Sequence, residues 1–123
     1  MEKYRLVAQR LLVLSDTCLE ALEHIRERMN DGHIHGTVFL FADVVEAVYI
    51  MDEALKPVLP QLSQADHLES CLLEIWTAME SMADFYDQRN STGLMVQLQE
   101  RLLPSYREWK ESLENTLHGY AVC

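Results

Sequence analysis

The stretch Val38 to Leu55, VFLFADVVEAVYIMDEAL, constrains the fold more than any other part of the chain. Its apolar residues are too many and too continuous for an ordinary surface helix, so we expect a helix that is buried more deeply than its neighbours. On a helical wheel one face carries Val38, Phe41, Val44, Val45, Val48, Met51 and Leu55. The rest of the chain is predicted to pack against this face.

Three further segments repeat apolar residues at three- and four-residue steps, and each predicts an amphipathic helix. They cover residues 2–29, the region from about 66 to 86, and the region from about 94 to 120. The links between the helices are short and contain glycine or proline, which end helices. This pattern predicts an all-α fold, a single up-down-up-down four-helix bundle over residues 1–123.

Several residues suggest how individual helices begin or bend. Thr37 is a candidate cap of the second helix, and Ser63 and Asp66 are candidate caps of the third. Pro104 lies inside the fourth helix but on its outer side, and the apolar seam keeps its phase across it. We therefore expect helix 4 to be kinked near Pro104 and not to split into two helices.

The net charge of −10 is concentrated in the middle of the chain. Residues 31–87 hold eleven acids against Lys56 alone, whereas the two flanking segments are balanced. Such an acid excess repels phosphate backbones and anionic headgroups, so we expect neither nucleic acid nor a membrane as a partner. A basic protein partner fits this charge, and a solvated acidic face without a specific role is the alternative.

The sequence also indicates the cellular compartment of the protein. The only N-terminal apolar run, Leu11–Leu14, is too short for a signal-peptide core, and Asp43 and Glu46 interrupt the only stretch long enough to span a membrane. Three cysteines are present: Cys18, Cys71 and Cys123. They cannot all pair within one chain and show no Cys-x-x-Cys spacing. We expect a soluble cytoplasmic protein with reduced thiols.

No residue pattern points clearly to catalysis or a cofactor. A di-iron bundle needs two Glu-x-x-His pairs, and neither is present. No glycine-rich phosphate loop and no nucleophile beside a base stands out. We therefore expect no cofactor and no enzymatic activity. The alternative is a metal-binding bundle or metal-dependent enzyme that uses His33 and His35 with the nearby acid Asp31.

Asp52 falls on the apolar face of the second helix, close to its C-terminal end. A carboxylate in that position meets a desolvation penalty and the unfavourable end of the helix dipole. One interpretation is a buried Asp52 that pairs with Lys3, Tyr4 or Tyr120. The other is that Asp52 stays wet at the end of the bundle.

Apolar residues outside the inward seams bear most directly on function. They are Leu6, Leu12, Val13, Leu19, Phe39, Ile50, Leu73, Val96 and Leu103. Because most of them fall on the first two helices, we predict a protein contact there, most simply a two-fold homodimer. The alternative interpretation is that each helix packs against two neighbouring helices in the core and therefore carries a wide apolar stripe.

Together these features predict a non-enzymatic, acidic helical module for protein–protein interaction, of the adaptor, chaperone or antagonist type. Its partner would be another protein, basic or helical, laid along an apolar groove. In architecture and acidity the chain resembles small bacterial export chaperones of helical-bundle type.

Overall fold

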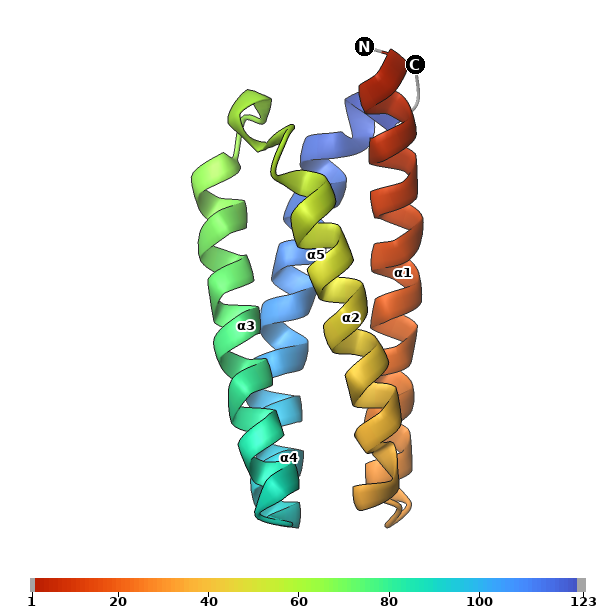
Figure 1. Cartoon of the computed structure of the whole chain (residues 1–123), viewed down its shortest axis with the longest axis vertical. Helices are drawn as coiled ribbons and strands as arrows, with labels where there is room; N and C mark the ends of the chain where they lie inside the picture. The colour runs from red at the N-terminus through yellow and green to blue at the C-terminus, as the bar shows by residue number, and fades with distance from the viewer. Residues whose placement is uncertain (1, 122–123) are drawn as a thin grey trace.

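The computed structural model describes residues 2–121, with side chains described for residues 4–120. Its elements are α1 (Glu2–Asn30), α2 (Val38–Leu55), α3 (Ala65–Asp87), α4 (Ser91–Gln97), a π-helical segment (Leu98–Leu102) and α5 (Leu103–Ala121), with 3-10 turns at His35–Thr37 and Leu59–Gln61. The π segment joins α4 to α5 into one continuous helical rod, which we call the fourth rod; α1, α2 and α3 are the other three. The four rods alternate in direction, and α1 begins at the end of the bundle where α5 ends (Figure 1). The predicted all-α four-helix bundle is confirmed. Among the described residues, no helix has both the length and the apolar character needed to cross a membrane.

Turn residues explain where two of the rods end and begin. After α1, Gly32 adopts a φ of 90°, a left-handed conformation that glycine accepts without strain. At the start of α4, the side-chain oxygen of Asn90 accepts a hydrogen bond from the backbone N–H of Gly93 at 2.8 Å. A Cβ on Gly93 would lie 2.8 Å from the side chains of Asn90 and Phe85, so a larger residue there would displace the capping side chain or Phe85.

The caps predicted for α3 are wrong, and the cap predicted for α2 is right only in its position. Gln64 occupies the cap position of α3, while Asp66 lies in the first turn, where its charge complements the helix dipole. Thr37 occupies the N-cap position of α2, as predicted, but its side chain makes no capping hydrogen bond. Thr37 is buried, and its hydroxyl donates a hydrogen bond to the carbonyl of Ile34 at 2.6 Å and shares a second one with the hydroxyl of Tyr86 at 2.7 Å. It therefore ties the start of α2 to the end of α3.

The fourth rod accommodates Pro104 through a π turn. Proline has no N–H to donate, and its ring crowds the preceding turn. Just before it, the N–H of Leu103 donates to the carbonyl of Leu98, five residues back, so this turn holds one extra residue. The extra residue brings Leu103 into the core beside Leu102, and the prediction that Leu103 faces outward is wrong. The kink near Pro104 stays a prediction.

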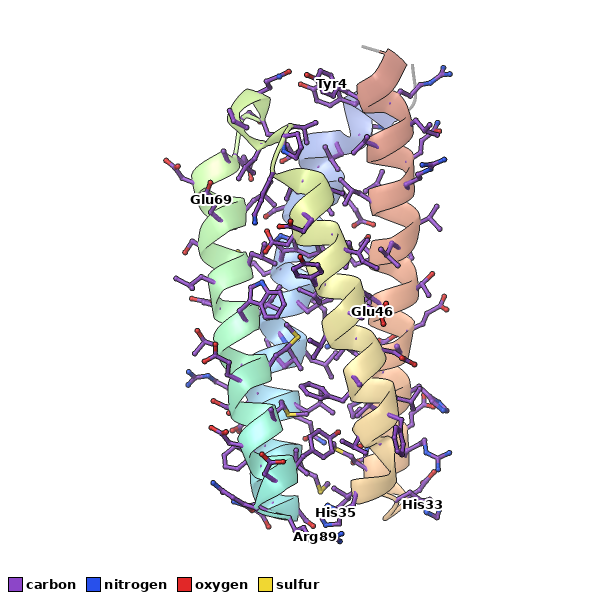
Figure 2. The ribbon with its side chains drawn as sticks, in the orientation of Figure 1. Tyr4, His33, His35, Glu46, Glu69 and Arg89 are labelled. Atoms are coloured by element: carbon purple, nitrogen blue, oxygen red, sulfur yellow. The ribbon has the colours of Figure 1, made fainter. Side chains whose placement is uncertain are left out.

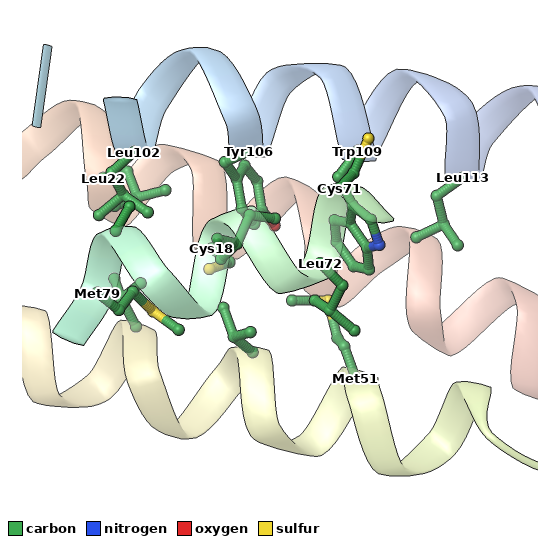
Figure 3. Packing of buried hydrophobic residues seen from close by; sticks show 14 of the residues in the cluster. Cys18, Leu22, Met51, Cys71, Leu72, Met79, Leu102, Tyr106, Trp109 and Leu113 are labelled. Carbon is green, nitrogen blue, oxygen red and sulfur yellow. The ribbon is translucent and has the colours of Figure 1, made fainter. Parts of the chain in front are cut away.

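The core runs between the rods, and Trp109 and Tyr106 of α5 are its largest fully buried side chains (Figure 3). Their rings pack with centroids 5.6 Å apart, and the Tyr106 hydroxyl donates to the backbone carbonyl of Ser15 on α1 at 2.8 Å. Most residues of the predicted seams are buried or pack against the core. Val38 differs from the prediction, because it is exposed, and the polar residue Ser15 takes an inner position on α1. The expectation that α2 is buried more deeply than its neighbours is also wrong, because Phe39, Tyr49 and Ile50 are exposed as well.

Candidate functional site

Acidic charge gathers on the half of the bundle formed by α2 and α3. The first of these helices carries four acids and the second six, and neither contains a lysine or an arginine. The helix α1, in contrast, holds five acids and five bases. Glu46 and Glu69 mark the two acidic helices in Figure 2. The excess of acids in the middle of the sequence therefore becomes an acidic half of the folded bundle.

The outer face of α2 combines acids with exposed apolar side chains. Steps of four and three residues place Phe39, Asp43, Glu46, Ile50 and Glu53 on one face, which we call the α2 stripe. All five are exposed; the exposed fraction is 80% for Phe39 and 49% for Ile50. The α2 stripe is thus an apolar and acidic surface on a helix without a basic residue, although Lys56, directly after the helix, forms an ion pair with Glu53.

The other residues predicted for a contact surface divide into two groups. Leu6 and Val13 are exposed on α1 and, being seven residues apart, lie on the same side of that helix. Leu12 and Leu19 are partly buried and pack against the core. Ile50 borders a groove between α1 and α2, so apolar surface continues from one helix to the other.

Asp52 is partly exposed and lines a shallow pocket between α2 and α3. Tyr4 and Tyr120 line a different pocket at the end of the bundle, where the Tyr4 hydroxyl accepts a hydrogen bond from Gln61 Nε2 at 2.9 Å. Lys3, the other expected partner, lies outside the described side chains. The prediction of a buried Asp52 is wrong, because this side chain sits at the edge of the apolar face, toward α3, where solvent reaches it.

His33 and His35, the histidines considered as weak metal ligands, lie at the end of the bundle where the chain turns from α1 into α2 (Figure 2). His35 is partly buried, and its Nε2 is 3.3 Å from the hydroxyl of Ser91 at the start of α4. His33 and Asp31 are exposed. Within the described part of the chain, His33, His35 and Asp31 do not bring three donor atoms together.

One group of metal-ligating side chains does converge, and it lies between α3 and α5. The donor atoms of His67, Cys71 and Glu108 all lie within 4.8 Å of one another. His67 Nε2 is 3.5 Å from Cys71 Sγ and 3.7 Å from Glu108 Oε1. Cys71 is buried, whereas His67 and Glu108 are exposed. Burial raises the pKa of the Cys71 thiol, and the nearby charges of Glu108 and Glu74 raise it further.

Sequence reasoning missed this group. Its visible signal is the spacing His67-x-x-x-Cys71, which places both side chains on one face of a helix. Glu108 comes from another helix, so its approach depends on how α3 and α5 are aligned. We therefore treat the group as a second site, separate from the α2 stripe.

These features define a small all-α bundle with one acidic half, an exposed apolar and acidic helix face, and one His/Cys/Glu group. The chain belongs to the family described as Domain of unknown function (DUF8042), whose model matches residues 7–112. This range includes all of the α2 stripe and all three members of the His/Cys/Glu group. No curated protein and no solved structure matches the chain.

Proposed function

We propose that the protein is a non-enzymatic interaction module that binds a basic protein partner through the α2 stripe. The observation that carries this proposal is the exposure of Phe39 and Ile50 among three acids on a helix that has no base. Contact with an apolar partner surface would remove both side chains from water. The acids Asp43 and Glu46 would attract and orient a partner that carries lysine or arginine beside its own apolar residues, whereas Glu53 already forms an ion pair with Lys56.

An amphipathic helix with basic residues is the partner that fits this stripe best. Such a helix places apolar anchors at three- and four-residue steps, which is the spacing of the stripe itself. The groove between α1 and α2, bordered by Ile50, offers a place for its apolar face. An adaptor, chaperone or antagonist would use its surface in this way.

The charge of α2 argues against a two-fold homodimer through the same stripe. A two-fold axis brings a patch against its own copy, so the acids of one protomer would face those of the other. Like charges placed opposite one another cost several kcal/mol, whereas a basic partner meets no such penalty. A basic partner is therefore favoured over a second copy of this chain.

The cytoplasm is the compartment we propose for this interaction. Cys18 and Cys71, the two cysteines whose side chains the structure describes, are free thiols. Free thiols of this kind are typical of a reducing compartment.

A pull-down from the native host tests the proposal. The wild-type chain, the double variant Phe39→Ala/Ile50→Ala and the control Leu73→Ala are immobilised, and retained proteins are identified by mass spectrometry. Leu73 is a matched control, because it is 68% exposed on α3, the other acidic helix. We expect the wild type and the control to retain a basic protein that elutes as salt rises. The double variant should retain at least about 30-fold less, since one aromatic anchor contributes about 2 kcal/mol or more.

Two results would contradict the proposal. The first is the same set of retained proteins from all three chains, which would mean that the α2 stripe makes no specific contact. The second is a wild-type dimer in light scattering that the double variant abolishes. That result would assign the stripe to self-association.

A further inference from the structure

We propose that His67, Cys71 and Glu108 form a binding site for a borderline-soft divalent cation, with zinc as the best fit. The site is independent of the α2 stripe, because it lies between α3 and α5 and shares no residue with the stripe. It also differs from the alternative metal site at His33 and His35 that the sequence offers.

The two distances from His67 Nε2 to the other donor atoms are close to those of a tetrahedral zinc site, and all three donor atoms lie within 4.8 Å of one another. With Zn–N and Zn–O of about 2.05 Å and Zn–S of about 2.3 Å, tetrahedral angles place N and S about 3.6 Å apart and N and O about 3.3 Å apart. His67 Nε2 lies 3.5 Å from Cys71 Sγ and 3.7 Å from Glu108 Oε1. Small side-chain rotations would therefore suffice to bring all three donors to one ion.

The elements that carry the donors hold them in place. His67 and Cys71 are four residues apart on α3, so the helix itself fixes them on one face. Glu108 lies on α5, which packs against α3 along the bundle. A cation bound by all three side chains would link the two helices.

The donor set selects the class of cation. One imidazole, one thiol and one carboxylate suit zinc and similar transition metals, whereas magnesium and calcium prefer oxygen ligands throughout. The thiol must lose its proton to bind, and a dication beside it offsets the negative charges of Glu108 and Glu74 that disfavour the thiolate. Three protein ligands leave the fourth position of a tetrahedral ion to water or to one further side chain.

Titration of the full chain with zinc and with cobalt(II) tests the site. We expect one equivalent of zinc to bind and to raise the Tm, and cobalt(II) to give the charge-transfer absorption of a thiolate ligand. The Cys71→Ser variant should lose this absorption and bind zinc at least about 100-fold more weakly, because even second-shell changes cost 10- to 100-fold. His67→Ala and Glu108→Gln should weaken zinc binding as well.

Matched variants separate this site from other thiols and acids. Cys18 is the control for Cys71, because it is also buried, packs beside Tyr106 and has a pKa that burial raises to about 11. Cys18→Ser, Cys123→Ser and Glu111→Gln should each keep wild-type zinc affinity and the cobalt absorption. Zinc binding that survives Cys71→Ser unchanged, or that is lost in Cys18→Ser or Cys123→Ser instead, would overturn the proposal. Absence of any zinc binding at micromolar concentration would overturn it as well.

Discussion

Replacement of Trp109 by alanine is expected to lower the free energy of unfolding by about 3–5 kcal/mol, the range for a large aromatic side chain removed from a core. The Trp109 side chain is fully buried, and its ring packs on that of Tyr106 at 5.6 Å. A domain of this size has about 5–15 kcal/mol of stability in total, so Trp109→Ala should remove a large share of that stability. Urea denaturation followed by circular dichroism measures the change.

The other tryptophan is the matched control for this prediction. Trp76 lies on α3 and is only partly buried, so Trp76→Ala should cost less than half as much as Trp109→Ala. Trp109→Phe offers a milder comparison: it keeps an aromatic ring and removes an indole N–H that has no hydrogen-bond partner among the described residues. Equal losses for Trp76→Ala and Trp109→Ala would show that the packing around Trp109 is not as described.

Reversal of charge on the α2 stripe is expected to weaken partner binding by on the order of 100-fold at low salt. The double variant Asp43→Lys/Glu46→Lys replaces two exposed acids between Phe39 and Ile50 with bases that would repel a basic partner. Its free energy of unfolding should stay within about 0.5 kcal/mol of the wild type, as for most surface changes. Titration calorimetry with the retained partner measures the loss, which should shrink as salt rises.

A variant with the same change in net charge elsewhere is the control. Glu100→Lys/Glu111→Lys alters two exposed acids on the fourth rod, far along the chain from α2. If this variant weakens binding as much as Asp43→Lys/Glu46→Lys, the attraction arises from net charge alone. The α2 stripe would then have no special role.

The four rods could be predicted because apolar residues repeat at helical spacing through each of them. The most apolar stretch, Val38 to Leu55, is α2 with those same bounds, and the first predicted helix ends one residue short of Asn30. The links at Gly32 and Asn90 contain the residue types that such turns require. The spacing of the apolar residues and the residue types in the turns indicate the same helices along the chain. The fold can therefore be predicted from the sequence.

The rotation of each rod about its own axis was harder to predict. Ser15 is buried because its hydroxyl donates to the carbonyl of Leu12 at 2.8 Å, so a polar residue can lie inward without an unsatisfied group. Leu103 is buried because of the π turn, which no helical wheel with a constant step describes. A small rotation of α2 about its own axis, relative to the helical wheel, is enough to make Asp52 partly exposed.

The His/Cys/Glu group depends on the alignment of two rods. Cys71 lies 18 residues before Arg89, and Glu108 lies 18 residues after Asn90. An antiparallel pair of helices that turns at these two residues therefore brings positions 71 and 108 to the same level. The spacing of His67 and Cys71 can be read from the sequence, but their meeting with Glu108 follows only when the turn is placed.

The most direct test of the central claim, that the α2 stripe contacts a basic partner, is photo-crosslinking in the native host. A photoreactive amino acid is placed at position 39 in one chain and at position 73 in another, because both side chains are highly exposed on acidic helices. We predict an adduct with one basic protein from position 39 and none from position 73, and loss of the adduct when Asp43→Lys/Glu46→Lys is added. No adduct at position 39, equal adducts at both positions, or an adduct only with a second copy of this chain would contradict the claim.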